Sequence, residues 1–205
     1  MYPSRWGSPG PHQQPDWQPP PHGPGMPGWL EERLFDQRIV MLRGQLTSEA
    51  STGISAALLT LDSAGPEMIQ LHVASPGGDL SAALAVVDVL DALTAPVHAL
   101  VTSEAGGAAL AILVAADRRS AYRHARFRLA EPRAAGVTGT ADEVAAAAGQ
   151  HLRELEEVLI RVAEVTGQPR SRVEDDFSTG RSLGAAEALE YGLIDEVVSP
   201  KKPRE

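Results

Sequence analysis

Short apolar runs alternate with helical patterns through most of this chain, and that alternation leaves few folds open to it. Strands are predicted at residues 38–42, 68–73 and 97–102, because each run is short and either apolar or alternating. Helices are predicted at 48–63 and 79–93, where apolar side chains recur and no proline interrupts them. Strand–helix–strand order is typical of an α/β fold with right-handed crossovers.

The second half of the chain continues this pattern and adds one long helix. A helix of small side chains is predicted at 106–116 and a short strand at 126–129. The long helix is predicted at 141–166, because Gly167 and Pro169 are the residue types that end a helix. Its apolar residues near helical spacing are Leu152, Leu155, Val158, Leu159 and Val162. Three further segments complete the chain: 173–177, 185–190 and 193–198.

Residues 1–28 differ in composition from the rest of the chain. They hold 9 of the 16 prolines and 5 of the 19 glycines, and proline lacks the backbone donor that helices and central strands need. We therefore predict a disordered, partly polyproline II arm at 1–28 and one folded domain at 29–205. The arm also lacks the apolar stretch that a secretory signal peptide requires.

Charge and composition exclude several classes of function. The 205 residues carry a net charge of −9 and no cysteine, so disulfides, thiolate metal sites and cysteine nucleophiles are excluded. An acidic chain lacks the basic face typical of a nucleic-acid-binding protein. No stretch reaches the roughly 20 apolar residues of a membrane span. We predict a cytoplasmic protein with no metal or other cofactor, no nucleic-acid partner and no membrane contact.

The sequence Ser75-Pro76-Gly77-Gly78 stands between a predicted strand and a predicted helix. Adjacent glycines at such a place allow a sharp turn and leave backbone N–H groups free to stabilise an anion or an oxyanion. A tight turn with no chemistry is the other interpretation of these four residues. The spacing matches neither a Walker loop nor a dinucleotide-binding fingerprint.

Four stretches in this order resemble one family: 38–44, 75–78, 166–168 and 187–197. The chain resembles the proteolytic subunit of the Clp protease (ClpP), within the larger ClpP/crotonase fold, over residues 33–198. That resemblance implies an α/β fold of repeated β-β-α and βα units with a protruding handle helix at 141–166. It also implies rings that stack into a barrel through this handle, although residues 145–149 lack the bulk that stacking would bury.

The resemblance implies a serine peptidase with a Ser, His, Asp triad, and each position is open to inspection. The nucleophile position falls on Gly107 and the position of the histidine base on Ala130. The third position matches Asp176. Glycine cannot attack a carbonyl and alanine cannot accept its proton, and loss of either group costs about 10⁴–10⁶ in rate. We therefore expect no intact triad.

The oxyanion cradle of the family consists of backbone, so the resemblance places it at Gly77 or Gly78 and at Ala108. Substitute side chains for the triad are poorly placed. Ser103 lies four residues before Gly107, and His124 lies six residues before Ala130, which is about 20 Å in extended chain.

The resemblance thus indicates a pseudopeptidase subunit that assembles into or regulates a Clp-type ring. Expected partners are copies of itself or other ClpP-type subunits, and a Clp ATPase unfoldase. One alternative is an enzyme, either a residual serine endopeptidase or a crotonase-type acyl-CoA enzyme with Glu104 or Glu131 as base. Another is a binding module whose cleft holds a peptide without cutting it.

Overall fold

One sheet organises the part of the chain that the computed structural model describes, which is residues 26–132, 136 and 138–198. Its main path runs β1-β2-β3-β4-β7, and all of these neighbours are parallel. β5 pairs parallel with β3 and antiparallel with β6. The strands are β1 Ile39–Leu46, β2 Ile69–Gly78, β3 Val97–Gly106, β4 Arg118–Tyr122, β5 Arg126–Arg128, β6 Ser182–Gly184 and β7 Glu196–Val198. The predicted α/β fold is confirmed.

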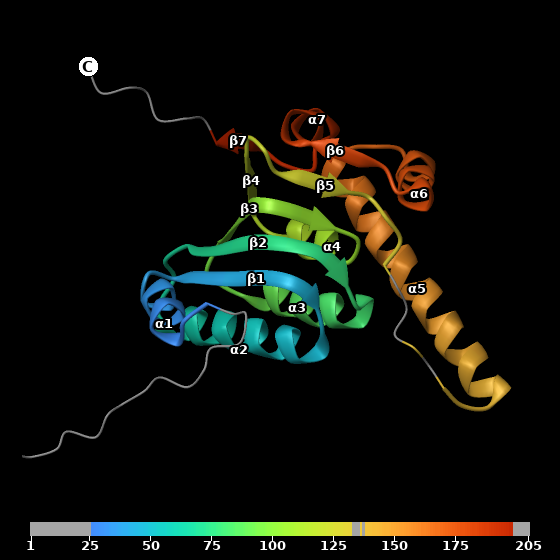
Figure 1. Cartoon of the computed structure of the whole chain (residues 1–205), viewed down its shortest axis with the longest axis horizontal. Helices are drawn as coiled ribbons and strands as arrows, with labels where there is room; N and C mark the ends of the chain where they lie inside the picture. Colours follow the sequence, from blue (N-terminus) through green and yellow to red (C-terminus); the bar gives the residue numbers. More distant parts are fainter. Residues whose placement is uncertain (1–25, 133–135, 137, 199–205) are drawn as a thin grey trace, which may run out of the picture.

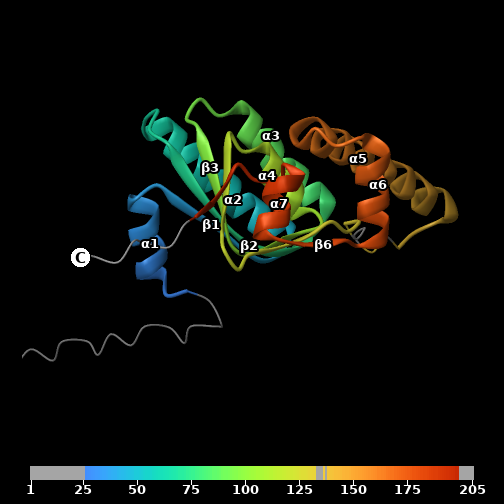
Figure 2. The same ribbon diagram turned by 90° about the horizontal axis from the view of Figure 1, so that it is seen from above.

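The helices lie mainly on one side of this sheet (Figure 1). α2, α3 and α4 pack in sequence against one another, and α5 packs on α3 and α4 before extending beyond the body of the molecule. Figure 2 shows α1 at the opposite end from α5 and α6. The helices are α1 Gly28–Asp36, α2 Ser48–Ala64, α3 Leu80–Ala92, α4 Ala109–Ala115, α5 Ala141–Thr166, α6 Arg170–Thr179 and α7 Ala185–Tyr191.

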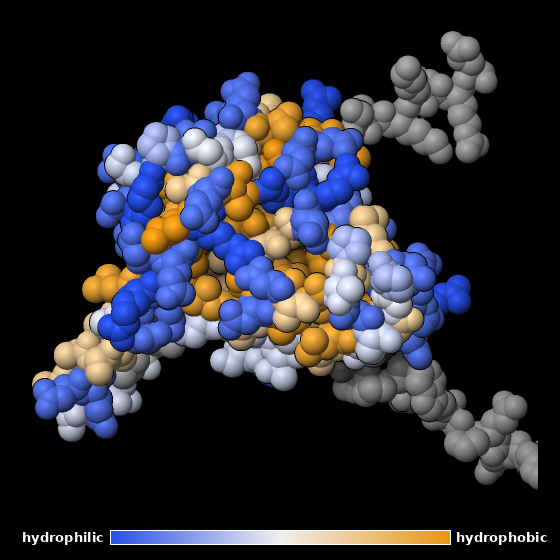
Figure 3. All heavy atoms as spheres, turned by 180° about the vertical axis from the view of Figure 1, so that it is seen from behind, coloured by the Kyte–Doolittle hydropathy of each residue, from blue (hydrophilic) through white to orange (hydrophobic). Residues whose placement is uncertain are grey.

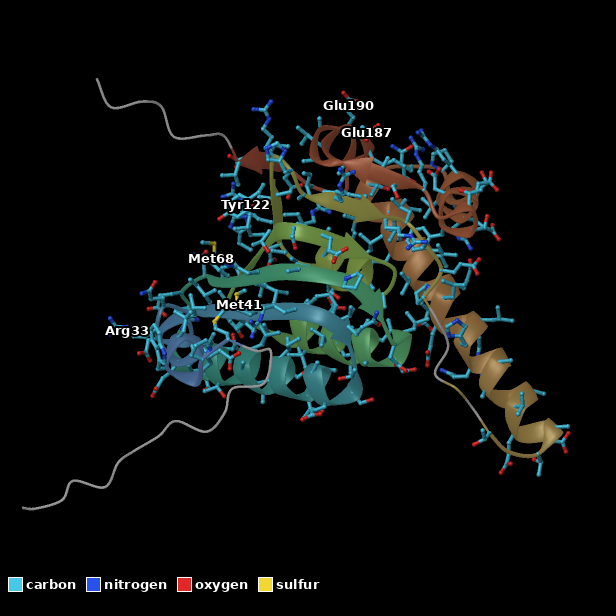
Figure 4. The ribbon with its side chains drawn as sticks, in the orientation of Figure 1. Arg33, Met41, Met68, Tyr122, Glu187 and Glu190 are labelled. Atoms are coloured by element: carbon cyan, nitrogen blue, oxygen red, sulfur yellow. The ribbon has the colours of Figure 1, made fainter. Side chains whose placement is uncertain are left out.

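Within the described part of the chain, the other face of the sheet carries no helical layer comparable to α2–α4. Strand β2 shows this directly, because Ile69, Leu71 and Val73 are fully buried whereas Gln70 and His72 between them are only half-buried. Parallel strands covered on both faces are usually apolar throughout, so this alternation indicates a sheet with one open face. Figure 4 labels Met41 and Tyr122, which come from strands β1 and β4 of the sheet.

The long helix α5 has the predicted bounds, because local signals set both of its ends. Thr140 and Glu143 form a reciprocal capping box at its start, and Gly167 ends it with a φ of 68°. Only its second half is buried, through Leu155, Val158, Leu159 and Val162. Leu152 was predicted on the same face, but its side chain is 64% exposed because the first half of α5 leaves the body.

The predicted C-terminal ends of β1, β2 and β3 are wrong, because each strand runs farther than predicted. The predicted turn at 75–78 is the end of strand β2, and its glycines pair with Gln45 and Leu46 of β1. Likewise β3 continues to Gly106, so α4 begins only at Ala109. Pairing with neighbouring strands keeps these residues in the sheet, and single-sequence patterns do not register such long-range pairing.

Three elements were missed by the sequence analysis. α1 contains Trp29, Leu30, Leu34 and Phe35 but buries none of its residues fully. β4 reads Arg-Arg-Ser-Ala-Tyr, with Ser120 and Ala121 as its buried positions. β6 has three residues and pairs only with β5. The predicted arm lies outside the described residues up to residue 25, and Gly28 already begins α1.

The core is aliphatic, with Phe127 and Phe177 as its largest fully buried side chains. Seen from behind, hydrophobic residues gather toward the middle of the helical face and hydrophilic residues surround them (Figure 3). None of the helices in the described part of the chain combines the length and apolar character needed to cross a membrane.

Candidate functional site

The end of strand β2 passes very close to both of its neighbours, and this explains its two glycines. A Cβ atom on Gly78 would lie 2.3 Å from the carbonyl oxygen of Leu46, and one on Gly77 would lie 2.8 Å from that of Gly106. Both glycines also have positive φ, which is 114° at Gly77 and 154° at Gly78. A larger residue at either position would force the strands apart.

The expected nucleophile position, Gly107, lies in the sharp turn between β3 and α4. Its φ is +47°, and its N–H donates to the carbonyl of Arg128 at 3.0 Å. This hydrogen bond ties the turn to the end of strand β5. A Cβ atom at Gly107 would meet only ordinary contacts, the nearest at 3.6 Å, so a side chain is absent from this position although space for one exists.

The expected base position, Ala130, follows strand β5 and is half-buried. Backbone hydrogen bonds hold its neighbours on both sides: the N–H of Leu129 donates to Arg181 at 2.8 Å, and that of Glu131 donates to Phe177 at 3.2 Å. Residue 130 is therefore fixed beside the segment that joins α6 to β6. Alanine at this rigid position offers no group that accepts or donates a proton.

The structure brings these two positions together with the glycine pair around one cavity of about 340 Å³. Such a volume is at the lower end of the range for ligand pockets, about 300–1,000 Å³. The residues that line it come from the ends of β1, β2, β3 and β5: Gln45, Pro76, Gly77, Gly78, Asp79, Gly107, Arg128, Ala130, Glu131 and Pro132.

The backbone groups expected to cradle an oxyanion are only partly available. The N–H of Gly77 donates to Oγ of Ser75 at 3.2 Å, so it already has a partner. Ser75 is itself anchored by donating to the carbonyl of Gly44 at 2.6 Å. Gly78 lines the cavity, whereas Ala108 is fully buried behind it.

The carboxylate of Asp176 belongs to a different group of side chains and does not line the cavity. Its Oδ2 accepts a hydrogen bond from the Tyr191 hydroxyl at 2.9 Å, and its Oδ1 lies 3.0 Å from Nη1 of Arg181. The guanidinium groups of Arg172 and Arg181 lie 5.4 and 5.7 Å from the Tyr191 ring centre. These contacts hold Asp176 toward α7 instead of toward Ala130.

Electrostatics supports this description of the Asp176 cluster. Burial of the phenol, followed by its hydrogen bond to the Asp176 carboxylate, raises the pKa of Tyr191 well above its ordinary value. Tyr191 is therefore a neutral donor to a charged acceptor, an arrangement that stabilises packing between α6 and α7. The cluster explains the position of Asp176 without any role in acyl transfer.

The other four candidate side chains lie at four different places. Glu131 lines the cavity, whereas Glu104 lines a neighbouring cavity of about 270 Å³ with Arg126 and Glu187. Ser103 is an exposed residue of strand β3, and His124 is exposed in the turn after β4. Of the two glutamates, only Glu131 adjoins the glycine pair.

Sequence reasoning missed Arg128, whose side chain lines both cavities. The sequence did contain a signal for it, because Arg126 and Arg128 flank the buried Phe127 in one strand. Alternation along a strand places both arginines on the face opposite to Phe127, which is exposed. Within the described residues there is no group of three or more His, Asp or Glu side chains placed to hold a metal ion.

Comparison with known proteins identifies the family. The family model described as Clp protease matches residues 29–201. The chain is also 34% identical over 171 residues to the ATP-dependent Clp protease proteolytic subunit 1 of Mycobacterium bovis. The aligned region covers 82% of this chain and 85% of that protein. The chain belongs to the Clp protease family. These matches confirm the resemblance seen in the four sequence stretches. They also confirm the general class of the protein as a Clp-type protease subunit.

Proposed function

We propose that this Clp protease family member is a non-catalytic subunit of a Clp-type complex. One observation carries the proposal: Gly107 and Ala130 both line the cavity beside Gly77 and Gly78, and neither has a reactive side chain. Acyl transfer by a serine peptidase needs a nucleophile and a base within hydrogen-bonding distance. The frame of a peptidase cleft is therefore present while the two groups that transfer atoms are missing.

The role that remains for such a subunit is structural or regulatory. We propose that it joins oligomeric rings with ClpP-type subunits and so changes their composition or their docking to a Clp ATPase unfoldase in the cytoplasm. Helix α5, with its exposed first half, is the element that extends farthest from the body for contact with another subunit. We further propose that residues 1–28 form an arm distinct from the domain at 29–205.

Two activity measurements test the absence of catalysis. The purified protein should not hydrolyse a fluorogenic peptide and should not react with a fluorophosphonate probe, while an active Clp proteolytic subunit does both under the same conditions. Covalent labelling of any serine, located by mass spectrometry, would contradict the proposal. Hydrolysis that needs no serine would instead favour an enzyme with Glu131 as base.

The assembly role is tested separately by native co-purification and mass measurement of the intact complex. A mixed ring with an active ClpP-type subunit is the expected result. A ring made only of this chain would limit the proposal to self-assembly, and a monomer in the native extract would overturn the assembly role.

A further inference from the structure

The cavity beside Gly107 contains one positive side chain that the described residues leave without a charged partner. Arg128 lines the cavity, and among the described residues it forms no ion pair and its guanidinium makes no hydrogen bond. Arg128 is an exposed residue, whereas the half-buried Arg119 and Arg161 are paired with Asp195 and Asp91. Arg128 is thus available to a ligand.

The negative side chains around the same cavity are differently placed. Asp79 also lines it, but its Oδ1 accepts the N–H of Ala82 at 2.8 Å and so caps helix α3. Glu131 is exposed and lies beside Ala130 on the segment that follows β5. The lining therefore carries one guanidinium and two carboxylates, of which that of Asp79 is engaged at the start of helix α3, and the remaining lining is mainly glycine, proline and alanine.

Space for a ligand exists where an active relative would place its reactive side chains. A Cβ atom on Gly107 would have no neighbour closer than 3.6 Å, and Ala130 ends at its own Cβ. A terminal carboxylate entering this space would lie near Arg128, and charge-assisted hydrogen bonds to a guanidinium are among the stronger polar contacts.

We propose that this cavity binds short peptides by their free α-carboxylate, with Arg128 as the residue that recognises it. The inference rests on the proposed function, since a cleft without a nucleophile holds a peptide without cutting its internal bonds. A free α-carboxylate is the group that hydrolysis of a peptide bond leaves on the acyl fragment. The ligand class is therefore the product of a peptidase. The carboxylate of Glu131 weakens its binding, because it repels the α-carboxylate of the ligand.

The test is a binding measurement that does not depend on turnover. The probe is a pentapeptide of four alanines and a C-terminal leucine, labelled with fluorescein at its N-terminus, and its anisotropy is followed as protein is added. The free acid should bind at least about tenfold more tightly than the C-terminal amide, since a charge-assisted hydrogen bond is lost.

Three variants of the full chain assign the effect to residues. Arg128→Gln should abolish the preference for the free acid. Arg126→Gln is the matched control, because Arg126 lies on the same side of β5 but lines only the neighbouring cavity, and it should keep the preference. Glu131→Gln should tighten binding of the acid about two- to fivefold by removing a like charge. Circular dichroism confirms that each variant is folded.

Equal binding of acid and amide, or no binding of either by the folded protein, would overturn the inference and leave the proposed function standing. A preference that survives Arg128→Gln would overturn the role of that residue. Failure of the proposed function looks different, because the amide probe or a longer peptide would then be cleaved and mass spectrometry would detect the fragments.

Discussion

A Cβ atom placed on Gly107 would lie 3.6 Å from the carbonyl oxygen of Ala130, in ordinary van der Waals contact. The two positions expected to carry nucleophile and base are therefore neighbours across the cavity, although they are separated by 23 residues of sequence. Lack of space does not require glycine at position 107, so a substitution there is informative.

Gly107→Ser should fold with a cost of about 1–2 kcal/mol, because its φ of +47° is unfavourable for a residue with a Cβ atom. The double variant Gly107→Ser with Ala130→His should react with a fluorophosphonate probe faster than either single variant. Thermal melts and labelling rates measure the two effects. Equal labelling of single and double variants would mean that the side chains do not meet across the cavity.

Adding Gly180→Asp to that double variant should raise its labelling rate by about 10-fold or more. The backbone bonds from Leu129 to Arg181 and from Glu131 to Phe177 place the C-terminal end of α6, with Gly180 as its cap, near Ala130. A Cβ atom on Gly180 would meet nothing within 4 Å. A carboxylate there would orient the introduced histidine. No gain over the double variant would contradict the placement of residue 180 beside the introduced histidine.

Gly78→Ala should destabilise the protein by about 2–4 kcal/mol, because its Cβ would lie 2.3 Å from a backbone atom of Leu46. Gly53→Ala is the matched control: Gly53 lies inside α2 with nothing within 4 Å of a Cβ atom. That control should stabilise by about 0.5–1 kcal/mol. Urea unfolding measures both, and a neutral Gly78→Ala would contradict the close approach of β1 and β2.

Tyr191→Phe should cost about 1 kcal/mol, because it removes the hydroxyl that donates to Asp176 at 2.9 Å while keeping the ring under Arg172 and Arg181. Asp176→Ala should cost more, since it leaves the Tyr191 hydroxyl and Arg181 without their shared acceptor. Chemical denaturation compares the two. A larger loss for the tyrosine variant would contradict the description of Asp176 as the centre of this cluster.

Stability should fall as the pH drops below about 6.5, in part because of two histidines on the open sheet face. Burial, together with repulsion from His98, lowers the pKa of His72, and burial followed by repulsion from Arg118 lowers that of His98. The unfolded chain therefore binds protons below pH 6.5 that the folded chain does not, and stability is lost with them.

The double variant His72→Gln with His98→Gln should flatten this dependence. Melting temperatures at pH 7.5 and pH 5.5 measure it for both proteins. The loss between the two pH values should be smaller in the variant, because glutamine does not titrate. Parallel slopes would show that other groups cause the loss at acid pH.

The sequence predicted the elements whose signals are local. Helix α5 begins and ends as predicted, because Thr140 with Glu143 and then Gly167 mark its ends within a few residues. Strands β1, β2 and β3 were predicted at their apolar cores but not at their full lengths. Their glycine-rich ends stay extended through pairing with other strands, and no local pattern encodes that pairing.

By itself, the sequence determined the identity of the residues at the two positions that the resemblance assigns to nucleophile and base, and glycine and alanine have no reactive group wherever they lie. Only the tertiary structure decided that Gly107 and Ala130 share a cavity with Arg128, and that Asp176 turns to Tyr191 and Arg181. The reason is physical: side-chain chemistry belongs to a residue, whereas a cavity or an ion pair depends on packing between segments distant in the chain.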